Sequence, residues 1–234
     1  MSDKTSKPIP AISAIMPAYN EEDILPVTMQ EATEALEELA EEWELLIVDD
    51  GSKDSTPQIL AEWSAKDPRI KILTQNPNQG YSKALIRGFY AATLPAVFYT
   101  DGDAQFDFCE LERLYPHLEN HDLVTGYRVG RKDPPIRFLT SFVYNILQSI
   151  ALGTHVRDVN CAFKLFRKSF FDVVKLDSDG FLIDAEIYAR AKKAKMKWTQ
   201  VGVTHHPRTL GSTTVSVSTV IETLRELWNL RRSV

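Results

Sequence analysis

The sequence predicts an α/β fold, with a mostly parallel central sheet and helices on both of its faces. Two observations support this prediction. Short apolar runs alternate with segments of helical periodicity from residue 11 to residue 127, and the connections between them are short. In such a chain each helix crosses back over the sheet and leads into the next parallel strand.

The individual elements can be assigned in chain order. Apolar runs predict strands, the first of which ends at Pro17, over 11–16, 44–50, 70–75, 96–101 and 122–127. Apolar residues at helical spacing predict helices over 23–42, 81–93 and 108–119. A further helix is expected to start at Ser55, because Gln58 follows three residues later and Pro57 suits a first turn. The many glutamates of 23–42 are expected to face water.

Composition limits the class of protein. The chain has 234 residues with 44% hydrophobic content, which is sufficient for one large core. Its net charge of -5 argues against a general nucleic-acid binder. Its two cysteines, Cys109 and Cys161, indicate neither a disulfide framework nor a zinc site and fit a reducing compartment.

The sequence also predicts neither a signal peptide nor a membrane-spanning helix. Residues 1–10 are polar and lack an apolar core. The uncharged run 138–153 includes five polar residues, and a spanning helix needs ~20 mostly apolar residues.

Polar clusters follow three of the predicted strands, over 17–22, 48–56 and 100–105. The carboxyl ends of parallel strands lie at one edge of a sheet, where ligands bind. The glycine-rich patterns of dinucleotide-binding folds and P-loops are absent. A diphosphate would therefore be held in another way.

The cluster after the fourth strand suggests that way. Asp101 and Asp103, separated by Gly102, can point at one divalent cation, and Gln105 adds a neutral oxygen. Mg²⁺ uses one or two carboxylates together with substrate phosphates. The cluster therefore predicts a metal that carries a diphosphate.

These motifs carry a resemblance to a known family. The segments PAYNEE, VDDGSKDST, NQGYSKALIRGF and DGDAQ occur in the order and spacing of inverting family 2 glycosyltransferases with the GT-A fold. Within that family the chain resembles dolichol-phosphate mannose and polyprenyl-phosphate glucose synthases, over residues 9–212. The resemblance implies an enzyme that transfers a hexose from a donor of the GDP-mannose or UDP-glucose type.

The resemblance implies roles for the nucleotide-sugar side of the site. Pro17, Tyr19 and Glu21 match the loop that holds the base and ribose. Asp49 and Asp50 match the pair whose carboxylate reads the base.

The same resemblance implies a metal set and a closing arginine. Asp101 matches the acid nearest the ribose and metal, and Asp103 and Gln105 match ligands of Mg²⁺ or Mn²⁺. Arg208 matches an arginine that closes over the diphosphate. Catalysis is thus expected to involve Asp103, Arg208 and Asp158, which matches a family aspartate near the reacting centre.

The chain departs from the family pattern at two positions. Thr213 stands where a lysine usually follows the Gly211-Ser212 motif, so any role of that lysine is in doubt here. Tyr81 likewise replaces a common lysine after Gly80.

The second half contains an uncharged amphipathic stretch. Apolar residues form a wide helical stripe over 138–151, and Arg137, Ser141, Asn145 and Gln148 share the opposite face. The stripe either packs on the protein's own sheet or lies in a membrane interface, and the resemblance favours the interface.

The resemblance further implies that Arg128, Arg137 and Ser141 bind the phosphate of the acceptor. Arginine suits this role because its planar fork binds phosphate oxygens in a bidentate way. The implied partners are a nucleotide-sugar donor, a polyprenyl phosphate and a membrane surface.

The acceptor determines whether a general base is needed. A sugar hydroxyl must lose a proton, whereas a phosphate monoester, with a second pKa of ~6, is largely dianionic at pH 7. Asp158 could serve as a base or orient an arginine. Asp184 and Glu186 are weaker candidates, expected on a solvated helix face. His205 and His206 are adjacent near a strand end and cannot both ligate one metal, so they are structural or acceptor-side.

The expected organisation is a flexible N-terminus over 1–8, a GT-A domain over 9–212 and an amphipathic helix over 213–234. That helix packs on the domain, forms a homodimer, lies on anionic lipid or docks on a membrane-anchoring subunit.

The expected function is metal-dependent, inverting transfer of a hexose to a polyprenyl or dolichyl phosphate, by a peripheral protein at the cytoplasmic face of a membrane. The alternatives are a saccharide or glycolipid hydroxyl acceptor and a catalytically silent binding subunit. A nucleotidyltransferase fits less well, because a basic phosphate-binding loop near the N-terminus is missing.

Overall fold

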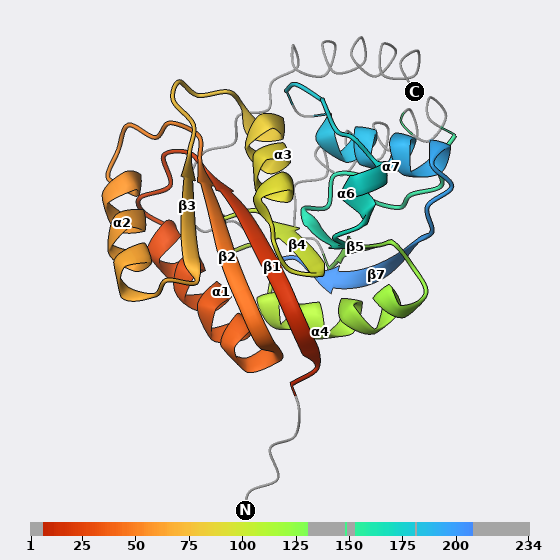
Figure 1. The fold of residues 1–234 in the computed structure, drawn as a ribbon, viewed down its shortest axis with the longest axis horizontal. Helices are drawn as coiled ribbons and strands as arrows, with labels where there is room; N and C mark the ends of the chain where they lie inside the picture. The colour runs from red at the N-terminus through yellow and green to blue at the C-terminus, as the bar shows by residue number, and fades with distance from the viewer. Residues whose placement is uncertain (1–6, 131–147, 149–152, 181, 208–234) are drawn as a thin grey trace, which may run out of the picture.

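The computed structural model describes residues 7–130, 148, 153–180 and 182–207. These residues form one seven-stranded sheet with the strand order β3-β2-β1-β4-β6-β5-β7 (Figure 1). The strands are β1 (Ile9–Ala18), β2 (Ala40–Asp49), β3 (Ile70–Thr74), β4 (Ala96–Thr100), β5 (Leu123–Val129), β6 (Phe163–Arg167) and β7 (Trp198–Thr204). Only β6 runs antiparallel to its neighbours among the paired strands described, so the expectation of a mostly parallel sheet is confirmed.

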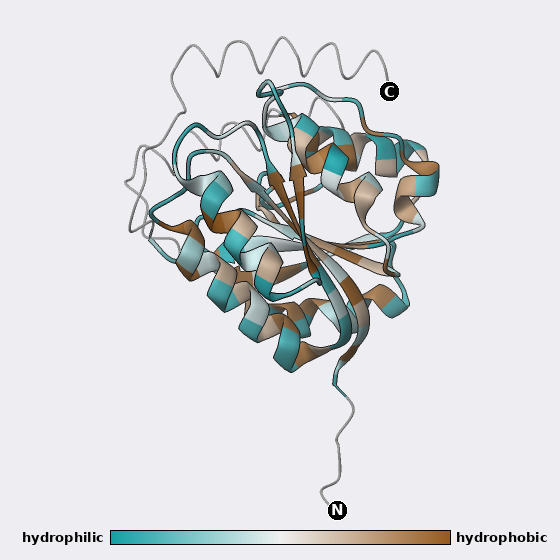
Figure 2. Ribbon diagram, turned by 60° about the vertical axis from the view of Figure 1, so that its left-hand side comes forward, coloured by the Kyte–Doolittle hydropathy of each residue, from teal (hydrophilic) through white to brown (hydrophobic). Residues whose placement is uncertain are grey.

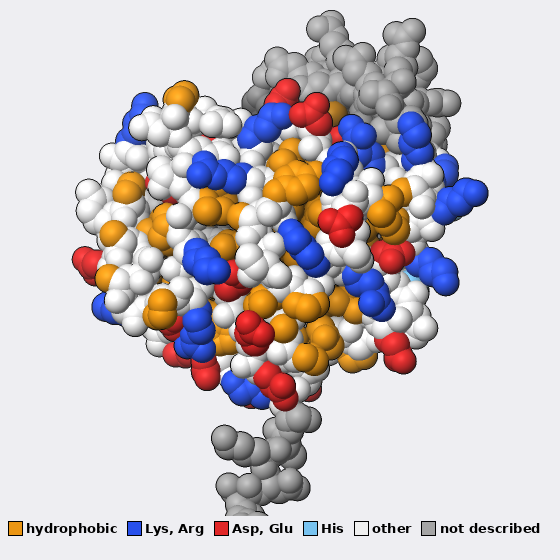
Figure 3. Space-filling model, in the orientation of Figure 1, with side chains coloured by type: hydrophobic (Ala, Val, Ile, Leu, Met, Phe, Trp, Pro, Cys, Tyr) orange, Lys and Arg blue, Asp and Glu red, His pale blue; other side chains and the backbone are white. Residues whose placement is uncertain are grey.

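Helices cover both faces of the sheet (Figures 1 and 2). They are α1 (Leu25–Leu39), α2 (Thr56–Lys66), α3 (Tyr81–Ala91), α4 (Leu111–Leu114), α6 (Phe170–Val173) and α7 (Ile183–Lys193). α3 packs closely on β1 and β2, where a side chain on Gly88 would collide with Ile15. In Figure 3, basic, acidic and hydrophobic side chains intermingle on the face that carries α3.

Two predicted helices differ from the structure. The helix expected over 23–42 ends at Leu39, because Ala40 already pairs with Ile9 in the sheet. The helix expected over 108–119 is instead the short α4 between two 3₁₀ helices, Phe108–Glu110 and Tyr115–Glu119. Pro116 lies at the start of the second of these and cannot donate a helical hydrogen bond.

The start of α2 is only partly as expected. Pro57 lies in its first turn, but the side chain of Ser55 makes no capping hydrogen bond. The backbone nitrogen of Thr56 donates to Asp54 Oδ1 at 3.0 Å instead, and the backbone nitrogen of Ser55 donates to Glu22 Oε2 at 2.8 Å. Ser55 is the N-cap of α2, so the expected helix start is confirmed, although its side chain does not form the cap.

Several predictions concern residues outside the described ones. The stripe over 138–151, apart from Gln148, and the amphipathic helix over 213–234 belong to this group. Gln148 is buried, whereas the sequence placed it on the polar face of its helix. No described helix is both long enough and apolar enough to cross a membrane.

A buried glutamate in β2 joins this strand to its neighbours near the starts of β3 and β4. Glu44 in β2 is 4% exposed and accepts hydrogen bonds from Ser13 Oγ at 2.5 Å, Thr93 N at 2.7 Å and Lys71 Nζ at 2.6 Å. Burial raises the pKa of Glu44, but the hydrogen bonds from Lys71, Ser13 and Thr93 together hold it below its ordinary value. The ionised carboxylate thus ties β1, β3 and the turn before β4 to β2.

Replacing Glu44 tests this connection. We expect Glu44→Gln to lower the free energy of unfolding by about 1–3 kcal/mol, because buried donors lose a charged acceptor. A depressed pKa in the folded state gives stability that is present above the unfolded pKa and lost as pH falls through the folded pKa. The variant should therefore show a smaller loss of stability on acidification below pH 4.5, the ordinary value, than the wild type does.

The measurement is urea unfolding at neutral and acidic pH. Glu42→Gln is the matched control, because Glu42 is exposed on the same strand. Equal stability and equal pH dependence in Glu44→Gln and Glu42→Gln would contradict the assignment.

Candidate functional site

The three polar clusters meet at the carboxyl edge of the sheet, since β2, β1 and β4 are parallel neighbours. Hydrogen bonds connect the loops after β1 and β2: Asn20 N donates to Ser52 Oγ at 2.9 Å, and Lys53 N donates to Asn20 Oδ1 at 2.8 Å. The loop after β4 is bound to α1, because Thr28 Oγ1 donates to the carbonyl of Gly102 at 3.0 Å. The clusters therefore form one surface, as the sequence predicts.

The residues matched to base and ribose lie on this surface. Pro17 is paired with Val48 near the end of β1, and the Tyr19 side chain is 44% exposed. Glu21 is fixed through its backbone, where its nitrogen donates to Thr56 Oγ1 at 3.0 Å. An exposed aromatic ring beside fixed backbone is suited to contact a nucleoside.

Asp49 and Asp50 are both buried and both have partners within the protein. Asp49 Oδ1 accepts from Ser52 N at 3.0 Å. Asp50 accepts from Gln75 Nε2 at 2.8 Å, from Gln79 N at 2.7 Å and from Gly80 N at 2.8 Å. Asp50 thus holds the loop that leads into α3, and reading of a base by this pair stays a prediction.

Asp101 lies at the end of β4 and is held by Tyr81. The Tyr81 hydroxyl donates to Asp101 Oδ1 at 2.8 Å. Burial and the nearby charge of Asp103 raise the pKa of Asp101 to about 7. Tyr81, where the family pattern has a lysine, supplies a hydrogen bond but no positive charge. Among the described residues, Asp101 therefore has a neutral hydrogen-bond donor in Tyr81 and faces the negative charge of Asp103.

The proximity of Asp101 and Asp103 bears on whether a metal fits this site. Asp101 and Asp103 offer hard oxygen ligands whose repulsion a divalent cation would relieve, which fits Mg²⁺ or Mn²⁺. Among the described residues no group of three or more His, Cys, Asp or Glu side chains is arranged to hold a metal. The residues fit an ion that is completed by water and substrate phosphates rather than one enclosed by protein.

Gln105 is joined to the chain after β7. Its Nε2 donates to the carbonyl of His206 at 3.0 Å, and His206 N donates to the Gln105 carbonyl at 2.8 Å. Gln105 N donates to Asp103 Oδ1 at 3.2 Å. His205 is buried with its ring 5.2 Å from that of Phe106, whereas His206 is exposed. Metal ligation by Gln105 stays a prediction.

Of the residues that the resemblance assigns to the acceptor and the reacting centre, the structure brings Arg128 and Asp158 together. Arg128 Nε donates to Asp158 Oδ2 at 2.7 Å, and Nη2 donates to Oδ1 at 2.8 Å. Of the two readings of Asp158, this geometry favours the one that orients an arginine. Arg137, Ser141 and Arg208 lie outside the described residues.

Asp184 and Glu186 correct the sequence analysis, which expected them on a solvated face. Both are buried on α7, at 5% and 1% exposure. Asp184 Oδ1 accepts from Lys164 Nζ at 2.6 Å, and Glu186 Oε1 accepts from Arg190 Nε at 2.5 Å. Sequence reasoning missed Lys164, and the available signal was a single lysine inside the apolar run 161–166.

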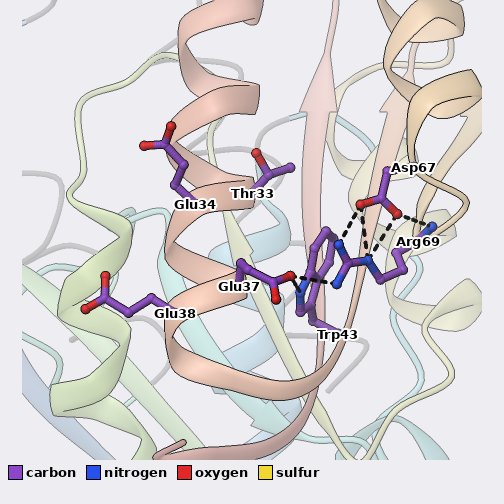
Figure 4. Close-up of a pocket in the computed structure, with 7 residues that line it drawn as sticks. All are labelled: Thr33, Glu34, Glu37, Glu38, Trp43, Asp67 and Arg69. Carbon is purple, nitrogen blue, oxygen red and sulfur yellow. Dashed lines mark hydrogen bonds and ion pairs between the residues drawn. The ribbon is translucent and has the colours of Figure 1, made fainter.

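A separate hollow of ≈ 460 Å³ lies at the opposite edge, beside α1 and the starts of β2 and β3 (Figure 4). Within it the Arg69 guanidinium lies 3.8 Å from the centre of the Trp43 ring and bonds to Asp67 and Glu37. Arg69, Asp67 and Glu37 are thus paired with one another, and the hollow is far along the strands from the acidic clusters.

Comparison with known proteins identifies the family. The profile described as Glycosyl transferase family 2 matches residues 13–175, more than half of the chain. The chain belongs to glycosyl transferase family 2. The matched range includes all three acidic clusters and the Arg128–Asp158 pair, and the chain is accordingly a glycosyltransferase.

The curated relatives of this family 2 chain include undecaprenyl-phosphate 4-deoxy-4-formamido-L-arabinose transferases. Those of Salmonella choleraesuis and Salmonella paratyphi B are each 29% identical over 225 residues, covering 94% of this chain and 67% of the relative. The expected likeness to polyprenyl-phosphate sugar transferases is confirmed.

Solved structures confirm the GT-A type of fold. Glucosyl-3-phosphoglycerate synthase from Mycobacterium tuberculosis, in complex with Mn²⁺, UDP and phosphoglyceric acid, has a TM-score of 0.73 at 18% identity, covering 96% of this chain and 78% of that one. The same enzyme with Mg²⁺ and UDP has a TM-score of 0.70 at 17% identity, covering 96% and 79%. At this identity the likeness concerns the fold alone.

The Asp50 cluster generates a prediction. Asp50→Asn replaces one accepting oxygen by a donor that faces backbone N–H groups, so we expect a loss of about 1–3 kcal/mol in stability. Hydrogen exchange at the amides of Gln79 and Gly80 should be faster. Asp49→Asn is the control, because the bond that Asp49 Oδ1 accepts from Ser52 N needs only a carbonyl oxygen. Wild-type exchange at both amides in Asp50→Asn would show that the carboxylate does not hold this loop.

Proposed function

We propose that this family 2 glycosyltransferase moves a hexose from a nucleotide-diphosphate donor to the phosphate of a polyprenyl lipid. Its curated relatives carry undecaprenyl phosphate in their names, which supports this acceptor class. The donor is of the GDP-mannose or UDP-glucose type, as the resemblance of the motifs implies.

The observation that carries the proposal is the state of the acceptor-side carboxylates. Asp158, Asp184 and Glu186 each accept hydrogen bonds from a cationic side chain, at 2.7, 2.6 and 2.5 Å. A hydroxyl acceptor needs a general base, such as a carboxylate, to take its proton. A phosphate acceptor is already ionised at neutral pH, with a second pKa of ~6, and needs no such group. Because these three carboxylates are already paired with cations, the arrangement favours an acceptor that needs no general base, such as a phosphate.

In this proposal the donor binds at the acidic clusters along the carboxyl edge of the sheet. Pro17, Tyr19 and Glu21 with the Asp49–Asp50 pair would contact the nucleoside. Asp101 and Asp103, with Gln105 nearby, would hold Mg²⁺ or Mn²⁺. When bound, the metal would supply positive charge to the diphosphate leaving group.

The acceptor side follows from the arginines. Asp158 fixes the guanidinium of Arg128, so that it presents its donors in one orientation towards a phosphate. Arg137 and Ser141 are proposed to complete this phosphate site, and Arg208 to close over the donor diphosphate. The phosphate oxygen attacks the anomeric carbon from the side opposite the diphosphate, which inverts its configuration.

We place the enzyme at the cytoplasmic face of a membrane, as a peripheral protein, because its proposed acceptor is a lipid. The organisation into 1–8, 9–212 and 213–234 belongs to the same proposal, with the last segment as a membrane, partner or dimer contact.

The acceptor class is tested by transfer from radiolabelled nucleotide sugars to a short polyprenyl phosphate and to the matching free polyprenol. We expect product from the phosphate at a rate at least about 100-fold above that from the alcohol, because only the phosphate binds the arginines and arrives ionised. Equal use of the two lipids, or transfer to saccharides alone, would exclude a phosphate acceptor.

The metal is tested independently. EDTA should abolish transfer, and added Mn²⁺ or Mg²⁺ should restore it. Asp103→Asn should lower kcat/KM by on the order of 100-fold, because charge stabilisation of the leaving group is weakened. Asp107→Asn is the matched control in the same loop, where the side chain caps a 3₁₀ helix through Cys109 N. Full activity in EDTA, or equal rates for the two variants, would rule out this metal site.

A further inference from the structure

Lys164 occupies an unusual position for a lysine. Its side chain is fully buried in β6, the antiparallel strand between β4 and β5, where it is paired with Tyr99 and Thr125. Burial of an ammonium group costs several kcal/mol unless partners compensate it, and an apolar residue of similar volume would often serve stability as well. A fully buried lysine here therefore calls for a role beyond filling the core.

Two of the hydrogen bonds of Lys164 reach the turn beside Arg128, on the proposed acceptor side. Lys164 Nζ donates to the carbonyls of Val159 at 3.0 Å and Cys161 at 2.6 Å. These carbonyls belong to a turn in which Cys161 N donates to the Asp158 carbonyl at 3.3 Å. The Asp158 side chain holds the guanidinium of Arg128, and one oxygen also accepts from Arg128 N at 3.2 Å. The ammonium group thus fixes the turn that orients Arg128.

The other two hydrogen bonds of Lys164 reach Asp184 and Tyr99, and Tyr99 lies near the proposed donor side. Lys164 Nζ donates to Asp184 Oδ1 at 2.6 Å and to Tyr99 Oη at 3.1 Å, and the Tyr99 hydroxyl also donates to Asp184. Tyr99 lies two residues before Asp101 on β4, on the same face of the sheet. Asp184 supplies the opposite charge that permits burial, while the carbonyls set the position of the turn.

We propose that Lys164 is a positioning residue, whose ammonium group holds the Asp158–Cys161 turn so that Asp158 presents Arg128 to the acceptor phosphate. This inference rests on the proposed phosphate acceptor. Lys164 touches neither donor nor acceptor. Asp101 is held by Tyr81 rather than by Lys164, so the loss of Lys164 should weaken the use of the acceptor and leave the use of the donor unchanged.

The experiment compares three proteins: wild type, Asp184→Asn, and the double variant Lys164→Met with Asp184→Asn. Lys164→Met alone would leave Asp184 buried without its cation, and Asp184→Asn leaves Lys164 buried without its anion, so the folded fraction of each variant is measured before its kinetics. The double variant removes both charges, and Asp184→Asn removes the ion pair while keeping the anchored carbonyls. The two variants differ in the ammonium group and its bonds to the two carbonyls and to Tyr99, and hydrogen exchange at the turn separates the effect on the carbonyls.

In the double variant we expect the KM for polyprenyl phosphate to rise roughly 10- to 150-fold, as for lost hydrogen bonds to a charged group. The donor KM should stay near the wild-type value, and Asp184→Asn should keep both. A purely structural role would instead lower the folded fraction, and with it the apparent kcat, at unchanged KM. That result, or a wild-type acceptor KM in the double variant, would overturn the proposal.

Hydrogen exchange gives a second readout that needs no acceptor. The amides of Arg128 and Cys161 should exchange faster in the double variant than in Asp184→Asn, while Gln79 and Gly80 should keep their protection. Unchanged exchange at Arg128 and Cys161 would overturn the positioning role. If the wild type does not use polyprenyl phosphate, the proposed function fails while this measurement still decides the positioning role.

Discussion

The parallel pairing of β1 with β2 and with β4 is the constraint on which the site depends. The register sets Ala18 opposite Asp49 and Ile15 opposite Tyr99, so the loops after all three strands leave the sheet at one edge. The fixed backbone at this edge holds Asp101 and Asp103 close together, although their charges repel one another. Burial of Asp101, and in second place the charge of Asp103, raises the pKa of Asp101. A cation that accompanies the donor is the natural way to relieve this repulsion.

On the proposed acceptor side, three acidic side chains are each paired with a cationic side chain. Asp158, Asp184 and Glu186 are bonded to Arg128, Lys164 and Arg190. These pairs organise loops and helices rather than leave carboxylates available for proton transfer. In the proposed function, the carboxylates at the strand ends bind a metal with the donor, and Arg128, held by Asp158, binds the phosphate of the acceptor.

Much of this could be predicted from the sequence, because local patterns determine it. Periodicity gave the first five strands and α3 to within a few residues, and the clusters at the strand ends gave the acidic edge. The antiparallel insertion of β6 and the burial of Lys164 could not be predicted. Both depend on contacts between residues far apart in the chain, such as Lys164 with Tyr99. Asp184 was misjudged for the same reason, since helical periodicity does not reveal a buried cationic partner.

The central claim is that the acceptor's own phosphate is the attacking group. The most direct test is the pH dependence of kcat/KM, measured with a polyprenyl phosphate and with its methylene phosphonate analogue, which has a higher second pKa. The acidic limb should move to higher pH with the phosphonate, because the enzyme's groups, Asp101 included, are the same in both assays. An acidic limb that does not depend on the acceptor, and that moves instead in Asp158→Asn, would show that a protein carboxylate acts as the base.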